Sequence, residues 1–210
     1  MPRLLSEHET QKLLKRFLPM ARARAVISER GLQTSAKHFP AVIKLISDKF
    51  THKSDIGGVI FARSREELLK AYKKLLDIAK KRKIRKYNIV LQEFIEGKQV
   101  IIGLKKDPTF GHVIMLGIGG IFAEQIRDVV FRKCPITAQD AGQMINDLKY
   151  KSILQGIRGT QRINLHFLES VLMRVSKIPI KFKKILELDI NPIILNSKGG
   201  KVVDARIVVE

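Results

Sequence analysis

The chain has 210 residues, of which 45% are hydrophobic and 29% are charged, and it contains no tryptophan. That hydrophobic content is too high for a disordered chain, and no apolar run approaches the roughly 20 residues that a membrane helix needs. The single cysteine excludes a disulfide framework. Together these features predict a globular cytoplasmic protein without a membrane partner.

The net charge is +20, from 40 Lys and Arg against 20 Asp and Glu. Such a charge attracts polyanions, including nucleic acid, nucleotides and acidic proteins. Many of the cations fall in one stretch, Lys70–Tyr87. This stretch is either a solvated helix face, with cations at its C-terminal end, or a dedicated nucleic-acid surface. The few aromatic residues argue against binding of single strands by stacking, and no helix-turn-helix, zinc-finger or RNP pattern is present.

The first half of the chain predicts helices and short apolar strands. Ser6 and Glu9 form a capping-box pattern for a helix that Pro19 stops. HFPAVIKLI (38–46) reads as a buried strand, and GGVIFA (57–62) as the strand that returns after THKSDIGG. A second capping pattern, Ser64 with Glu67, opens an amphipathic helix.

The second half predicts several further strands and two helices. The expected strands are NIVLQEFI (88–95), KQVIIGLKK (98–106), GHVIMLGIGG (111–120), and ILELDINPIIL with KVVDARIVV around the turn NSKGG. Thr137 with Asp140 opens one helix and Asn164 caps another. We therefore expect an α+β protein with two lobes that meet near residues 92–97. The N-terminal helix and a small lobe would occupy residues 1–95, and a large lobe residues 96–210.

Lys44 is the charged residue of the apolar run AVIKLI. Burying an ammonium group is costly unless it reaches a partner. Lys44 is therefore either a functional cation or a lysine on an edge strand whose amine reaches water.

The stretch ELDINP places three polar residues, Glu187, Asp189 and Asn191, at alternate positions of an apolar strand. Period-two spacing puts them on one face of a sheet, where neighbouring carboxylates repel unless a cation lies between them. Hard oxygen ligands suit Mg²⁺ better than zinc. Asp204, on the next strand, could add a carboxylate. The alternative is an acidic edge that faces solvent.

The stretch THKSDIGG combines His52, Lys53 and two glycines. Each feature is weak by itself, because a lone histidine is usually a surface residue and this is not a Walker motif. With Lys44, the glycines of GIGG (117–120) and the acidic strand, they suggest nucleotide phosphates held through magnesium.

Several motifs resemble one family in the same order along the chain. IKLISDKFTHKSDIGGV, VLQEFIEG, VIIGLKKDPTFGHVIMLGIGGIFAE, DVVFRKCPI, GIRG and ELDINPIIL…GG…VVDARI are similar to the β subunit of ADP-forming acyl-CoA (acetate–CoA) ligases. The likeness runs from about Phe39 to the C-terminus. It implies a two-lobed ATP-grasp fold, related to the nucleotide-binding part of succinyl-CoA synthetase, with the nucleotide site between the lobes.

The resemblance implies roles for individual residues. Lys44 matches the lysine that contacts nucleotide phosphates, and Lys53 a second basic residue. Gln92, Glu93, Phe94 and Ile95 match the hinge whose backbone recognises adenine. Asp189, Asn191 and Asp204 match magnesium-binding positions. Gln99 stands where the family usually has a ribose-binding glutamate, so we expect altered ribose binding.

His52 matches the histidine that carries phosphate between subunits in this family. A neutral imidazole is nucleophilic near pH 7, and its phosphoramidate is labile. The implied reaction is acyl-CoA + ADP + phosphate ⇌ acid + CoA + ATP, with Mg²⁺ as cofactor. The implied partner is a CoA-binding α subunit, in an α2β2 heterotetramer.

Two other functions remain open from the sequence. A non-catalytic ATP-grasp protein could use the basic helix to hold RNA or an acidic partner, with an affinity that falls steeply with salt. A different ATP-grasp ligase could form an acyl phosphate directly and would need no histidine.

Overall fold

The computed structural model describes residues 1–47, 56–120, 127–156 and 161–210. The chain forms two compact units, one made of residues 1–20 and 95–210 and the other of residues 21–94. We call them the large unit and the small unit. The predicted boundary after residue 95 is one residue from the observed one, between Phe94 and Ile95.

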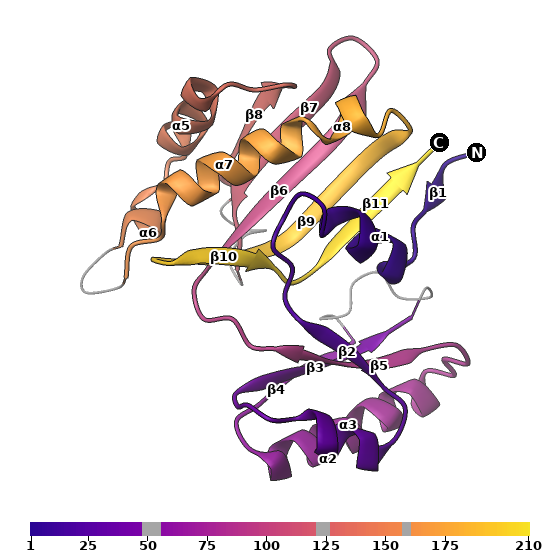
Figure 1. The fold of residues 1–210 in the computed structure, drawn as a ribbon. Coiled ribbons are helices and arrows are strands. Elements are labelled where there is room, and N and C mark those ends of the chain that lie inside the picture. The colour runs from indigo at the N-terminus through magenta and orange to yellow at the C-terminus, as the bar shows by residue number, and fades with distance from the viewer. Residues whose placement is uncertain (48–55, 121–126, 157–160) are drawn as a thin grey trace. The chain divides into compact units, whose positions relative to one another are not determined.

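The N-terminal residues belong to the large unit, although the sequence led us to place them with the small lobe. Strand β1 (Arg3–Leu4) pairs with β11 (Ala205–Val209), so both termini lie on neighbouring strands (Figure 1). Leu14 and Leu18 are buried in the core of the large unit. The distant strand partner and this core, neither visible in the local sequence, decide where residues 1–20 pack.

The large unit is an antiparallel sheet with helices on one face. Within the described residues its seven strands run in the order β1-β11-β9-β6-β7-β8, and β10 pairs with β9. Besides β1 and β11, its elements are α1 (Glu7–Leu14), β6 (Lys98–Asp107), β7 (Gly111–Ile118), β8 (Val129–Lys133), α5 (Ala138–Asp147), α6 (Ser152–Gln155), α7 (Leu165–Ser176), α8 (Ile178–Lys181), β9 (Ile185–Asn196) and β10 (Gly199–Val202).

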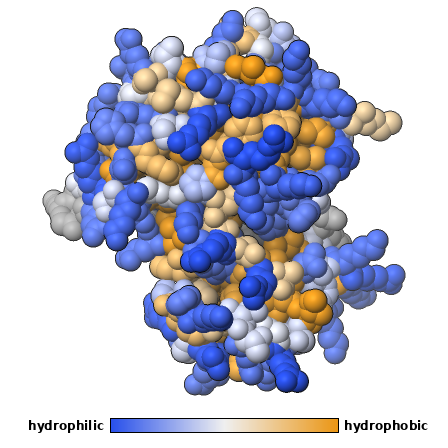
Figure 2. All heavy atoms as spheres, viewed as in Figure 1, coloured by the Kyte–Doolittle hydropathy of each residue, from blue (hydrophilic) through white to orange (hydrophobic). Residues whose placement is uncertain are grey.

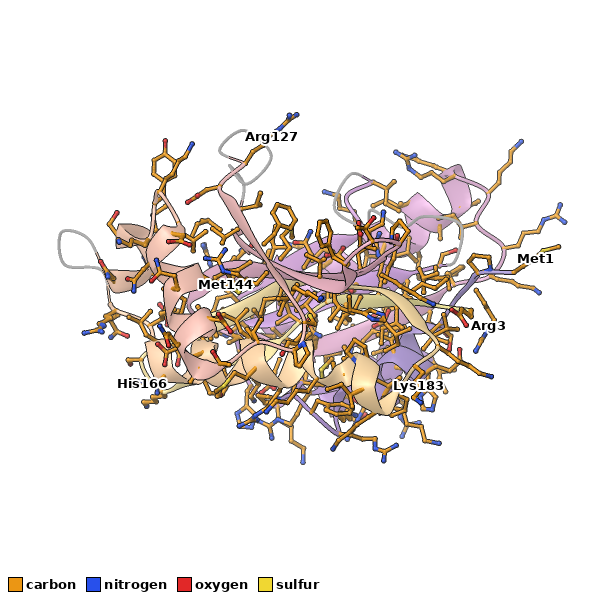
Figure 3. All side chains as sticks on the ribbon, turned by 90° about the horizontal axis from the view of Figure 1, so that it is seen from above. Met1, Arg3, Arg127, Met144, His166 and Lys183 are labelled. Carbon is orange, nitrogen blue, oxygen red and sulfur yellow. The ribbon has the colours of Figure 1, made fainter. Side chains whose placement is uncertain are left out.

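Alternation along the strands decides which side chains of the large unit face the helices. On β6, the buried residues Val100, Ile102 and Leu104 alternate with more exposed ones. They pack with residues of α5 and α7, including Met144 and Leu168, in one core. Figure 3 shows His166 and Lys183 on the helix side of this sheet and Arg127 on the other side.

The small unit is a four-stranded antiparallel sheet in the order β2-β5-β3-β4. Its elements are β2 (Ala23–Val26), α2 (Glu29–Ser35), β3 (Ala41–Ile46), β4 (Val59–Ala62), α3 (Arg65–Lys81) and β5 (Asn88–Glu93). Ile43 and Leu45 of β3 pack with Leu68 and Leu75 of α3 in a second, separate core. Leu32 of α2 belongs to the same core, so both helices cover the same face of the small sheet.

The predicted helix starts are confirmed. Ser6 and Thr137 each form a capping box, with Glu9 and Asp140. The Ser64 side chain accepts the N–H of Glu67, and Asn164 accepts that of Phe167. The backbone N–H of Ser6 holds the pKa of the Glu9 carboxyl below its ordinary value.

The structure differs from the predicted strands in four places. The stretch KVVDARIVV forms two strands, β10 and β11, separated at Val203–Asp204. Strands β1, β2 and β8 were not predicted, because they are only two, four and five residues long. In the view of Figure 2 hydrophilic side chains cover most of the visible surface, in keeping with the high charge. Among the described residues, no helix combines the length and apolarity required to span a membrane.

Candidate functional site

In the small unit, Lys44 lies on an interior strand of the sheet. Strand β3 pairs with β5 on one side and β4 on the other, and Lys44 is 7% exposed. Lys44 is therefore not an edge-strand lysine that reaches water. Because Ile43 and Leu45 face the helices, the Lys44 side chain points to the opposite face of the sheet. This burial supports the interpretation of Lys44 as a functional cation.

Gln92 shares the face of Lys44. On β5 it lies opposite Val42, two residues from the Lys44 partner Val90. Paired residues of antiparallel strands project to the same side, so Gln92 and Lys44 lie close together on the face turned away from α2 and α3. Gln92 is 5% exposed. The polar side of the small sheet thus carries a buried cation beside a buried amide.

The predicted hinge residues differ in their surroundings. Glu93 accepts the backbone N–H of Arg22 at 2.7 Å and forms an ion pair with its guanidinium at 3.2 Å. The Phe94 ring meets the edge of Phe61, with centroids 6.0 Å apart. Ile95 is the first residue of the next segment of the large unit. The unit boundary therefore falls inside the predicted hinge 92–95.

In the large unit, a bulge in β9 arranges the acidic strand. Ile190 pairs with Ile102 and Ile193 with Val100, so three steps on β9 match two on β6. Both Ile190 and Ile193 are buried in the helix-side core, and the bulge residues Asn191 and Pro192 lie between them. The peptide bond between those two residues is cis.

The bulge brings Asn191 beside Asp204. The N–H of Asn191 donates to the carbonyl oxygen of Asp204 at 3.1 Å, and Val203 N–H donates to Pro192 at 3.1 Å. Asp189 lies two residues before Asn191, and its register partner Gly103 is on β6. The Asp189 side chain leaves the sheet on the face without the core helices. Asp189, Asn191 and Asp204 thus lie around one bulge, where the backbone of Asn191 meets that of Asp204.

This donor set has the chemistry of a magnesium site. Two carboxylates and one amide supply the hard oxygen ligands that Mg²⁺ prefers. Among the residues that the structure describes, no group of three or more His, Cys, Asp and Glu side chains is placed to hold a metal. The set therefore depends on Asn191 as its third donor. Glu187, which the alternation placed beside them, instead pairs with Lys105 at 3.3 Å.

Gln99 contacts the glycine-rich end of β7 through its backbone. The N–H of Gly119 donates to the Gln99 carbonyl at 2.9 Å. A Cβ at position 119 would lie 3.0 Å from the Gln99 carbonyl carbon, so the close approach favours glycine there. The Gln99 side chain is exposed. It also leaves the sheet on the Asp189 face, because it alternates with buried Val100.

The remaining predicted residues, His52 and Lys53, lie outside the described residues. Sequence reasoning missed Arg206, which lies directly opposite Asp189 in the β9–β11 register and on the same face. The signal was present, because Asp204 and Arg206 have the two-residue spacing of one strand face. A cation opposite Asp189 adds an anion-binding group to this part of the sheet.

Comparison with known proteins assigns the chain to a family. The profile of the ATP-grasp domain matches residues 2–209. The β subunit of acetate–CoA ligase (ADP-forming) I from Pyrococcus furiosus is 34% identical, over 99% of this chain and 92% of that subunit. The chain belongs to the ATP-grasp family and, within it, to the β subunits of ADP-forming acetate–CoA ligases.

Some relatives of this ATP-grasp β subunit are much longer proteins. Acetate–CoA ligase (ADP-forming) I of Archaeoglobus fulgidus is 37% identical over 91% of this chain, but the match spans only 28% of that protein. The family thus includes proteins in which this domain is one part of a longer chain.

Solved structures share the fold. Acetyl-coenzyme A synthetase 1 of Ca. Korarchaeum cryptofilum, in complex with coenzyme A and Ca-AMPCP, has a TM-score of 0.90 at 38% identity. The match covers 99% of this chain and 94% of that one. A second structure of the same synthetase has a TM-score of 0.82 at 37% identity, and the match covers 99% of this chain and 93% of that one. That structure is a complex with coenzyme A and Mg-AMPPCP, in which the phosphohistidine segment points towards the nucleotide binding site.

Proposed function

We propose that the chain is the nucleotide-binding subunit of an ADP-forming acyl-CoA ligase, which makes ATP from acyl-CoA, ADP and phosphate. One observation carries this proposal: the chain matches an ADP-forming ligase β subunit over 99% of its own length and 92% of that subunit. The buried Lys44 and the Asp189–Asn191–Asp204 bulge support it, because a buried cation and a group of hard oxygen donors suit nucleotide phosphates and Mg²⁺.

Nucleotide binding would use side chains of both units. Lys44 would contact phosphate oxygens as a buried point charge. The backbone of Gln92–Ile95 would recognise the adenine edge, and Gln99 would hydrogen-bond the ribose with an amide that both donates and accepts. Asp189, Asn191 and Asp204 would hold Mg²⁺, which neutralises charge on the phosphate oxygens.

Phosphoryl transfer would use His52. The neutral imidazole accepts a phosphoryl group made from phosphate and acyl-CoA on a separate α subunit, where CoA and then the acid are released. An oxygen of the ADP β-phosphate then attacks phosphorus, the N–P bond breaks and its electrons return to the imidazole, giving ATP. Lys44 and Lys53 would stabilise charge on the transferring oxygens. We propose an α2β2 assembly for the whole ligase.

Labelling of the chain alone tests the carrier histidine. Incubation with Mg²⁺ and ATP labelled with ³²P at the γ-phosphate should give an acid-labile, base-stable label on wild-type protein. His52→Ala should remove that label. The matched control is His166→Ala, because His166 is 97% exposed on α7 and pairs only with Glu169 among the contacts described. It should label like wild type.

Reconstitution tests the whole reaction. With an α subunit, acetyl-CoA, ADP, Mg²⁺ and labelled phosphate, wild type should form ATP and His52→Ala should not. Full turnover by His52→Ala would instead support direct acyl-phosphate chemistry. No ATP with any acyl-CoA tested, together with salt-sensitive RNA binding, would favour the non-catalytic function.

A further inference from the structure

Two adjoining hollows lie at the C-terminal end of α2 in the small unit. The first, of about 350 Å³, is lined by residues of β2, β5 and the α2–β3 connection, including Arg22, Arg24, Lys37, His38 and Glu93. The second, of about 580 Å³, is lined by Gln33, Thr34, Ala36, Lys37, Phe39 and Arg65. Both hollows are lined by Ala36 and Lys37. We call the pair the α2 groove.

The first hollow opens on the helix side of the small sheet, opposite to Lys44. Arg24 pairs with Leu91, and Leu91 pairs with Ile43, whose side chain is in the helix-side core. Directly paired residues project to the same side, so Arg24 shares the face of Ile43. Glu93 pairs with Ala41 and follows the same alternation. Arg24 and Glu93 thus lie on the helix side of the small sheet, whereas the Lys44 side chain points to the opposite side; Gln92 also lines the first hollow.

The charges of the first hollow are unbalanced. Glu93 is its one carboxylate, and Arg22 already pairs with it. Arg24 donates to the Ser35 hydroxyl at 3.4 Å, and within the described part of the chain neither Arg24 nor Lys37 pairs with a carboxylate. Cations gathered around one hollow repel one another, and a bound anion would offset this repulsion by attracting each of them. A basic hollow with a nearby hydroxyl has the chemistry of an anion site.

Size and lining narrow the class of anion. A hollow of about 350 Å³ is larger than a single phosphate needs and lies at the lower end of ligand pockets. Its lining contains no phenylalanine, tyrosine or tryptophan, although His38 lines it and Phe39 lines the second hollow. Guanidinium groups such as that of Arg24 bind phosphate oxygens in pairs.

We propose that the α2 groove is a second anion site, which binds a compact phosphorylated ligand with two or more phosphate groups through Arg24 and Lys37. This site does not require the ligase reaction, although Gln92 and Glu93 of the proposed adenine-binding hinge also line the first hollow. It places Arg24 on the helix side of the small sheet, whereas Lys44 points to the other side.

Calorimetric titration of the full chain with inorganic pyrophosphate, at low salt and without Mg²⁺, tests the site. The key variant is the double substitution Arg24→Gln with Lys37→Gln. The matched control is Lys73→Gln with Lys74→Gln on α3, which removes the same charge from an exposed helix surface. We expect about tenfold weaker binding by the groove variant and less than twofold change in the control, because only the groove supplies direct hydrogen bonds.

A further titration and a check of folding are needed to interpret the result. Because Lys44 is itself proposed to contact phosphate, the groove and control substitutions are also titrated in a Lys44→Gln background, where the groove variant should still bind more weakly. Circular dichroism should show that every variant is folded. Equal weakening by the groove variant and the α3 control would show only general charge attraction and would overturn the proposal. No further weakening when the groove substitutions are added to Lys44→Gln, or no binding by wild type, would overturn it as well.

Discussion

The two units of the chain differ in the size of their cores and in the charged residues that they carry. The large unit has the more extensive core, built on the seven described strands, and carries the acidic cluster Asp189–Asn191–Asp204. The small unit has four described strands and a smaller core. Residues 21–94 nevertheless contain 18 of the 40 Lys and Arg but only 7 of the 20 Asp and Glu. The large unit thus carries the candidate metal ligands, while the small unit has a dense excess of cations.

The two units thus differ in the chemistry that each could offer to phosphate. Carboxylates act on phosphate only through a metal, whereas lysine and arginine act directly. Substitutions in the large unit should therefore change the response to Mg²⁺, and those in the small unit should change phosphate binding with or without it.

The largest effect is expected from Asp189→Asn. Removal of one carboxylate should lower ligase activity by about 100-fold, because charge on the transferring phosphoryl group would lose much of its stabilisation. The affinity for a nucleotide analogue, measured by calorimetry, should no longer rise when Mg²⁺ is added. Glu187→Gln is the control, since Glu187 is an exposed neighbour on the same strand that pairs with Lys105. If Mg²⁺ raised the nucleotide affinity of Asp189→Asn as much as that of wild type, the large unit would not hold the metal through Asp189.

Lys44→Met should weaken nucleotide binding at least tenfold, whether or not Mg²⁺ is present, because a direct phosphate contact is lost. Lys86→Met removes an exposed lysine of the same unit and should leave the affinity near that of wild type. If Lys44→Met weakened nucleotide binding only in the presence of Mg²⁺, the prediction that Lys44 binds phosphate directly would be wrong.

Core truncation should separate the stability of the units. Ile43→Ala and Ile190→Ala each remove a fully buried side chain and should cost about 2–5 kcal/mol of unfolding free energy. For Ile43→Ala, amide hydrogen exchange should become faster only in residues 21–94. The small unit has the smaller core, so the loss of one buried side chain should favour its local unfolding. Equal loss of protection in both units would show one cooperative structure.

Ser6→Ala should cost about 1 kcal/mol through loss of the helix cap. If residues 1–20 belong to the large unit, the added hydrogen exchange should appear in β11 and not in residues 21–94. The pKa of Glu9 is lowered, so its contribution to stability is present above the ordinary carboxyl pKa and is lost as pH falls through the folded value. The cost of Ser6→Ala should shrink in acid, which chemical denaturation at pH 7 and pH 3 would measure.

The smallest effect concerns Cys134 in the large unit. Burial raises the pKa of its thiol to about 11, so little thiolate exists at pH 8. Iodoacetamide should therefore modify native protein more slowly than a free cysteine, with a rate that rises towards pH 11. Modification at the rate of free cysteine at pH 8 would show that this part of the large unit opens readily.

Local sequence signals predicted much of the fold. Capping at Ser6, Ser64, Thr137 and Asn164 could be read directly, because a cap is a contact within three residues. The buried strand that contains Lys44 could be read from its apolar neighbours. Short strands such as β2 and β8 could not, because their stability comes from partners distant in the sequence.

The candidate site was likewise predicted from the sequence only in part. The sequence by itself determined which residue types are available: one lysine in an apolar strand, and carboxylates at alternate positions of another. Only the tertiary structure decided that Lys44 lies on an interior strand, that the bulge at Asn191 meets Asp204, and that Glu187 pairs with Lys105. It also decided that Arg24 and Lys37 line one hollow. The reason is that spacing along the chain determines the face of a strand, whereas pairing between strands determines which side chains meet.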